Sequence, residues 1–184
     1  MLLYLVFVFL FWRFMNRQGL IFSAIVLGIL LLGGCTEQSA HRSYTNNVYG
    51  FSLDPPTGWQ RIEGELPNVA VRFTPVNSSN VSLIVSVPFI LSEGLALSTF
   101  ADQIEENLSE SGANYTIMSR DWRPTPDAQA YEITYSVEQD GITEYVTQVA
   151  LLRTRTVFLI TFTAPSDLYN QSITGVDNSI ESFR

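Results

Sequence analysis

The stretch YEITYSVEQDGITEYVTQVALL, residues 131–152, predicts two long antiparallel strands. Its first half alternates polar residues with an apolar set, as in a strand that buries one face: Tyr131, Ile133, Tyr135 and Val137. Asp140-Gly141 supplies the residue types of a tight hairpin turn, and a return strand follows from Ile142 to Leu152. This hairpin indicates a sheet whose strands pair with their neighbours in sequence.

Similar alternation elsewhere predicts further strands at Val48–Leu53, Val69–Thr74, Val81–Val87, Tyr115–Met118 and Thr156–Thr163. Helical spacing of apolar residues predicts two helices, over Ser98–Ser111 and Ser166–Phe183. Thr99 and Asp102 resemble a capping box, Gly112 a helix stop, and Ser166 a cap for the second helix. The order predicts an α+β fold, an antiparallel β-sheet flanked by helices. We expect Trp59 and Phe183 to be buried.

The first 34 residues form an N-terminal hydrophobic segment with the layout of a lipoprotein signal. From Met15, a short basic start leads into the apolar run Leu20–Leu32, which ends in Gly33-Gly34-Cys35. A run of this length is short for a transmembrane helix, which needs about 20 residues. Another apolar run, Leu2–Trp12, precedes this complete signal, so the favoured start is Met15, with residues 1–14 untranslated. The alternative is a pair of spans joined by a cytoplasmic turn that contains Arg13 and Arg17.

The Leu32-Gly33-Gly34-Cys35 sequence is a lipobox, and its small residues allow a peptidase to reach the bond before Cys35. We expect the Cys35 thiol to carry a diacylglyceryl group, with further acylation at the new N-terminus. Residues 35–47 would then be a flexible tether and residues 48–184 a single domain. This arrangement predicts a membrane-anchored protein on the extracytoplasmic face, in the periplasm or at the cell surface.

The charge of the mature chain argues against nucleic acid as a partner. The sequence has ten arginines, no lysine and eighteen acidic residues. After Cys35 there are eight arginines against all eighteen acids, a formal charge of −10. Such a surface repels phosphate backbones and gains nothing from anionic lipid, so the covalent anchor would hold the chain to the membrane. A single cysteine excludes an intrachain disulfide.

Few residues are candidates for catalysis or metal binding. His41 is the one histidine and lies in the expected tether, so neither a catalytic triad nor a histidine-rich zinc site is expected. A hydrolase would need catalytic groups that the sequence does not offer. Asp102, Glu106 and Glu110 could share a helix face and hold calcium weakly, but a solvated polar face is the more ordinary interpretation. We expect no enzyme activity and no metal.

Two loops are candidates for surface functions. Arg120, Trp122 and Arg123 fall in the expected loop Ser119–Pro126 and have the composition of a protein-binding loop. Arg153 and Arg155 form a smaller basic spot at a hairpin turn. Asn77 and Asn80 are sequons in a polar loop and are the first candidates for glycosylation in an organism that glycosylates surface proteins. Three more sequons stand at Asn107, Asn114 and Asn170.

The domain resembles the PsbP family in residues 49–59 (YGFSLDPPTGW), 80–85 (NVSLIV), 158–161 (FLIT) and 180–183 (IESF). The resemblance implies an α-β-α sandwich, a fold shared with Mog-type nuclear-transport factors and DcrB lipoproteins. Family members include extrinsic photosystem II subunits and many lipoproteins without known function. The metal-binding histidines of photosystem members have no counterpart here, so the resemblance implies no cofactor beyond the covalent lipid on Cys35.

Two functions are compatible with these observations. The first is a lipid-anchored, non-enzymatic domain that binds or scaffolds a membrane-associated protein. The second is a carrier of a small molecule or metal ion with a cleft at the sheet. A photosystem-associated role is implied by the family resemblance alone. A deep apolar cleft would favour the carrier, whereas a flat patch of arginine and aromatic residues would favour the protein partner.

The lipobox makes a direct prediction. Cys35→Ser removes the acyl-accepting thiol, so the variant should accumulate as uncleaved precursor and take up no labelled fatty acid. Metabolic labelling followed by gel electrophoresis measures both. Fatty acid incorporated into the Cys35→Ser chain would show that the lipoprotein interpretation is wrong.

Overall fold

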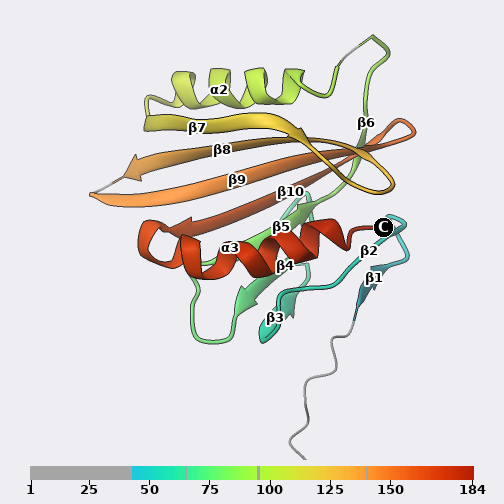
Figure 1. Ribbon diagram of the computed structural model, residues 1–184, viewed down its shortest axis with the longest axis horizontal. Helices are drawn as coiled ribbons and strands as arrows, with labels where there is room; N and C mark the ends of the chain where they lie inside the picture. Colours follow the sequence, from blue (N-terminus) through green and yellow to red (C-terminus); the bar gives the residue numbers. More distant parts are fainter. Residues whose placement is uncertain (1–42, 65, 95, 140) are drawn as a thin grey trace, which may run out of the picture. The chain divides into compact units, whose positions relative to one another are not determined.

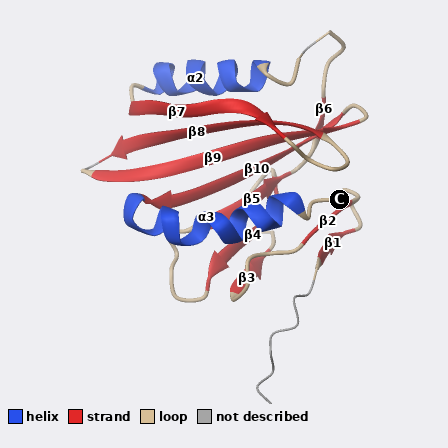
Figure 2. Ribbon diagram, in the orientation of Figure 1, coloured by secondary structure: helices blue, strands red, loops and turns tan. Residues whose placement is uncertain are grey.

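The computed structural model describes residues 43–64, 66–94, 96–139 and 141–184, and these form a sheet with a helix on each face (Figures 1 and 2). The signal segment, Cys35 and His41 lie outside the described residues. The helices are α2 (Thr99–Ser111) and α3 (Ser166–Glu181). The strands are β1 (Tyr44–Asn46), β2 (Phe51–Leu53), β3 (Trp59–Ile62), β4 (Val69–Pro75), β5 (Ser82–Ser86), β6 (Phe89–Ile90), β7 (Asn114–Arg123), β8 (Gln129–Gln139), β9 (Ile142–Arg153) and β10 (Thr156–Pro165).

The main sheet is antiparallel, in the order β3-β4-β5-β10-β9-β8-β7, and β6 pairs with the end of β10. The last four strands are neighbours both in sequence and in space, as the hairpin at residues 131–152 predicted. Gly141 in the β8–β9 turn has φ 75°, which an L side chain rarely adopts. The pairing Phe162↔Leu83 joins this meander to the strands from the first half of the domain.

Alternation along the central strands sends side chains to opposite faces of the sheet. One face packs against α3 in a cluster that includes Phe73, Leu83, Phe162 and Ile180. The other face packs against α2 in a smaller cluster around Ala101 and in an adjacent one around Leu97. The expected α+β fold and its α-β-α sandwich are therefore confirmed (Figure 1).

The domain begins earlier than the expected boundary at Val48. Tyr44 lies in β1, which pairs with β2, so the tether does not reach residue 47. Its ring is buried against Phe51 and Phe73, and its hydroxyl donates a hydrogen bond to Glu63 at 2.7 Å. Burial, together with this hydrogen bond, raises the pKa of Tyr44 to about 12. A lone aromatic in a polar stretch has no sequence period to reveal it.

Several local expectations were wrong. Trp59 is half-buried, with its ring 6.5 Å from Phe162, because it lies on edge strand β3, which the sequence did not predict; Phe183 is buried as expected. The hydroxyl of Thr99 donates back to the Ala96 carbonyl at 2.6 Å, so it forms no capping box. Pro165, not Ser166, is the N-cap residue of α3.

The fully buried Phe162 gives a test of the core. Phe162→Ala should lower the free energy of unfolding by about 3–5 kcal/mol, because it removes apolar contacts and leaves a cavity beneath α3. Urea denaturation followed by circular dichroism measures the change. Trp122→Ala, at an exposed position, is the control and should change stability by less than about 1 kcal/mol. Equal losses in the two variants would contradict this assignment of the core.

Candidate functional site

Arg120, Trp122 and Arg123 lie in a strand, not in the loop that the sequence predicted. Strand β7 continues to Arg123 and pairs with β8 along its length, with Trp122 opposite Tyr131. Within the described residues β7 has β8 as its one neighbour, so it forms an edge of the sheet. Edge strands often carry charged residues that discourage pairing with other chains. The sequence of such a strand is therefore polar, like that of a loop, which explains the wrong prediction.

The alternation of β7 separates the three residues. Arg120 and Trp122 point to the face that carries α2, and Arg123 points to the face that carries α3. A shift of register between Ile117 and Ser119 leaves Met118 exposed in a bulge. The predicted binding loop is therefore not one surface, because its members face opposite sides of the sheet.

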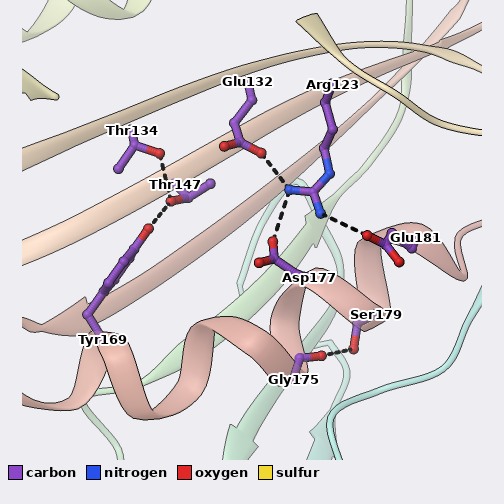
Figure 3. A network of polar contacts seen from close by, with 9 residues as sticks. All are labelled: Arg123, Glu132, Thr134, Thr147, Tyr169, Gly175, Asp177, Ser179 and Glu181. Carbon is purple, nitrogen blue, oxygen red and sulfur yellow. Dashed lines mark hydrogen bonds and ion pairs between the residues drawn. The ribbon is translucent and has the colours of Figure 1, made fainter. Parts of the chain in front are cut away.

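The Arg123 side chain is largely buried and is paired with carboxylates of β8 and α3 (Figure 3). Its Nη1 donates to Glu132 at 2.6 Å and to Asp177 at 3.0 Å, and Nη2 lies 4.0 Å from Glu181. The side chain is 13% exposed. Burial alone would lower the pKa of Arg123, but the hydrogen bonds to Glu132 and Asp177 raise it above its usual value. Arg123 thus fastens α3 to the sheet and is not available to a partner.

A series of hydrogen bonds between hydroxyl groups on the same face also connects α3 to the sheet (Figure 3). The hydroxyl groups of Thr134 and Thr147 are 3.0 Å apart, and that of Tyr169 lies 2.6 Å from Thr147. The Tyr169 ring packs 5.2 Å from Phe162. These bonds satisfy hydroxyls that would otherwise be buried without partners. Periodicity alone could not indicate these hydrogen bonds, because both threonines occupy ordinary strand positions.

Arg120 binds helix α2 from the opposite face. Its Nη1 donates to Asp102 at 3.3 Å and to Glu105 at 3.2 Å, and all three side chains are substantially exposed. Asp102 is therefore engaged with an arginine. Across the described ranges, no three His, Cys, Asp or Glu side chains gather closely enough to hold a metal ion.

Trp122 is the member of the predicted trio that remains open to a partner. Its side chain is 53% exposed, and its ring meets Tyr131 edge-to-face at 5.2 Å. One side of the indole is thus supported while the rest faces solvent. A partner that covers Trp122 would gain apolar contact with little additional loss of side-chain freedom.

Two open depressions flank the β9–β10 turn. The first has a volume of about 530 Å³ and is lined by Asp127, Ala128, Gln129, Leu152, Arg153 and Thr154. The second, about 280 Å³, is lined by Leu91, Ser92, Glu93, Leu152, Thr154 and Arg155. The basic spot predicted at Arg153 and Arg155 thus lies at the end of the sheet between two shallow hollows.

Comparison with known proteins places the fold in a family. A family model described as PsbP matches residues 39–184. The chain belongs to the PsbP family. CyanoP of Thermosynechococcus vestitus is 27% identical over 127 residues, which are 65% of this chain and 69% of that protein.

Two solved structures have the same fold as this PsbP domain. The solution structure of cyanobacterial PsbP (CyanoP) from Synechocystis has a TM-score of 0.61 at 16% identity, over 83% of this chain and 98% of that one. LpqN, involved in cell envelope biogenesis of Mycobacterium tuberculosis, has a TM-score of 0.54 at 12% identity, over 73% and 82%. Both likenesses speak to fold. Neither helix in the described part of the PsbP domain is long and apolar enough to cross a membrane.

Asn77 and Asn80 are exposed in the loop between β4 and β5. The Oγ of Ser79 donates to the side-chain oxygen of Asn80 at 3.2 Å. The loop leaves room for a modification, and glycosylation stays a prediction. Asn114 is a poorer acceptor, because its side-chain amide already donates to Glu138 at 2.9 Å.

The two arginines of β7 provide a matched pair of variants. Arg123→Gln should lower the free energy of unfolding by about 3 kcal/mol, because it leaves Glu132 and Asp177 without their shared cation. Arg120→Gln removes exposed ion pairs and should cost less than about 1 kcal/mol. Chemical denaturation of both variants measures the difference, and similar losses would show that Arg123 does not fasten α3.

Proposed function

We propose that this PsbP-family protein is a lipid-anchored, extracytoplasmic and non-enzymatic domain that binds a membrane-associated protein. The lipobox ending at Cys35 supports the anchor and the location. The structural likeness to LpqN, a protein of cell envelope biogenesis, is in keeping with an extracytoplasmic site. The likeness to CyanoP makes a photosystem-associated role an expectation from the family.

The observation that carries the proposal is the exposed Trp122 on the free edge strand β7. Tryptophan is enriched among residues that dominate protein–protein binding energy. A sheet edge adds backbone N–H and C=O groups that an extended segment of a partner can pair with. The site on the protein is thus Trp122 together with the backbone of β7, with Arg120 beside it on the same face.

The polar side chains described above are in keeping with a non-enzymatic role, because they bond to one another and hold the helices to the sheet. The chain has a single histidine, His41, and a single cysteine, Cys35, and both lie before the described domain. The hydroxyls of Thr134, Thr147 and Tyr169 are bonded to one another on the α3 face, and none has a basic partner to activate it. The polar groups of this domain fasten helices to the sheet.

A small-molecule carrier is the alternative, and the depression of about 530 Å³ is the observation in its favour. Its volume falls within the range of ligand sites, and Asp127, Gln129 and Arg153 could supply polar contacts. The hollow is open and not an enclosed apolar cleft, however, which favours the protein partner. The proposal needs no cofactor beyond the covalent lipid.

Strand β7 contains its own control, because Met118 and Trp122 are both 53% exposed. A photo-crosslinking amino acid at exposed Arg120, which shares a face with Trp122, should yield one discrete protein adduct when the full chain is in native membranes. Trp122→Ala should reduce that adduct by about tenfold or more, as loss of a binding hot spot does, whereas Met118→Ala should have a small effect. Equal adduct in the two variants would remove Trp122 from the site.

A further inference from the structure

The two ends of the sheet differ in charge. At the β8–β9 hairpin end, the surrounding elements contribute four carboxylates: Glu110, Glu138, Glu144 and Asp167. Arg72 also reaches that end, where its Nη2 donates to the Ser79 carbonyl at 3.1 Å. At the opposite end is the turn between β9 and β10 (Figure 1), where Arg153 is the last residue of β9 and Arg155 lies in the turn. The hairpin end is therefore acidic, whereas the β9–β10 turn presents two arginines on a domain whose overall charge is strongly acidic.

Apolar side chains accompany the arginines. We define the tip as Phe89, Ile90, Leu91, Arg153, Thr154 and Arg155. Strand β6 places them together, because Ile90 pairs with Thr156 and the Leu91 N–H donates to the Arg155 carbonyl at 2.8 Å. Ile90 is 63% exposed, and Phe89 is also exposed while its ring packs 5.2 Å from Phe100. Exposed apolar residues beside cations are typical of surfaces that lie at a membrane interface.

The cations of the tip are open to an external anion. Neither Arg153 nor Arg155 forms an ion pair with another described residue. Two carboxylates face them: Glu93 lines the depression that contains Arg155, and Asp127 lines the one that contains Arg153. Asp127 is already paired with Arg184 at 3.4 Å. Asp127 is therefore engaged by another arginine, and Glu93 is the carboxylate that lies beside Arg155.

The anchor brings this end within reach of a bilayer. Ser43 is eight residues after Cys35, so the tether spans at most about 29 Å when fully extended. Strand β2, which pairs with β1, is linked to the tip end of the sheet through Arg184. The Ser52 carbonyl accepts from the Arg184 N–H at 2.9 Å, and the Arg184 guanidinium reaches Asp127 beside the tip. Strands β1 and β2 lie toward the same end of the sheet as the tip (Figure 1), so a short tether that leads into β1 limits the faces that the domain can present to the membrane.

We infer that the tip is a membrane-docking surface. Phe89 and Ile90 enter the headgroup region of the bilayer to which the Cys35 lipid is attached, and Arg153 and Arg155 contact lipid phosphates. The covalent anchor supplies the attachment, and the tip sets the orientation. The acidic hairpin end then points away from the anionic surface, and the edge strand β7 is presented beside the membrane. This inference rests on the proposed lipid anchor.

Ile90 and Ile142 provide a matched pair of reporter positions. Ile142 is 60% exposed and lies at the hairpin end, opposite the tip. The full acylated chain is reconstituted in phosphatidylcholine vesicles with a minority of phosphatidylglycerol, carrying a spin label at Ile90→Cys or at Ile142→Cys; the parent chain corrects for any label on Cys35. The label at 90 should be several-fold more accessible to oxygen, relative to a water-soluble nickel chelate, than the label at 142. Equal exposure of the two labels to water overturns the inference.

A charge variant tests the contribution of the arginines. The double change Arg153→Gln and Arg155→Gln should reduce protection of the label at 90 and make it insensitive to salt, whereas Arg61→Gln, at an exposed position on β3, should not. Protection that appears in native membranes but not in lipid vesicles means that a protein covers the tip, and this too overturns the inference.

Intact-mass analysis of the same samples distinguishes a failure of the proposed lipid anchor from a failure of the tip inference. An acylated chain whose label at 90 remains in water contradicts the tip alone. A chain without lipid on Cys35 whose label at 90 is still protected supports the tip and contradicts the anchor. A normal melting temperature for each labelled variant shows that the comparison is made on folded protein.

Discussion

Strand β10 holds the two halves of the domain together. One edge of β10 pairs with β9 and the other with β5 and β6, so the meander of β7 to β10 joins the earlier strands through it. Its side chains have apolar contacts on both faces: Phe158, Ile160 and Phe162 are buried in the cluster beneath α3, and on the other face Val157 is buried and Leu159 is half-buried. A strand buried on both sides cannot shift register by one residue without exchanging the two sets of apolar contacts. The positions of both helices, and of the edge at β7, depend on this register.

The sequence revealed elements whose burial is regular. Apolar residues recur at a period of two in the β8–β9 hairpin and the central strands, and at a period close to four in both helices. This period can be recognised in the sequence without knowing which elements pack together. Strands β3 and β6 were missed because they are short and largely exposed, so they have no apolar face to repeat. Tyr44 was missed for a related reason: its pocket is made by Phe51 and Phe73, which only the folded chain brings to it.

The candidate site shows a stricter limit of sequence reasoning. Composition alone grouped Arg120, Trp122 and Arg123 in one binding loop, and it could not tell that they lie on a strand whose alternation divides them. Arg123 meets Asp177 across more than fifty positions of sequence, and the spacing of Asp177 and Glu181 on one face of α3 is the only local trace of that contact. Exposure is likewise a property of the fold, and it is what distinguishes Trp122 from Trp59.

The long-range pairings also constrain the order in which the chain can fold. Strand β5 has β4 and β10 as its neighbours, and β2 pairs with Arg184, the last residue, through two hydrogen bonds. The N-terminal third of the domain therefore stays incomplete until the final strand and helix are present. Local hairpins close quickly, whereas contacts between distant segments wait for loop closure. During synthesis or export, the β7–β10 meander would form first. The strands that precede it would dock last, even though they emerge first from the ribosome or the translocation channel.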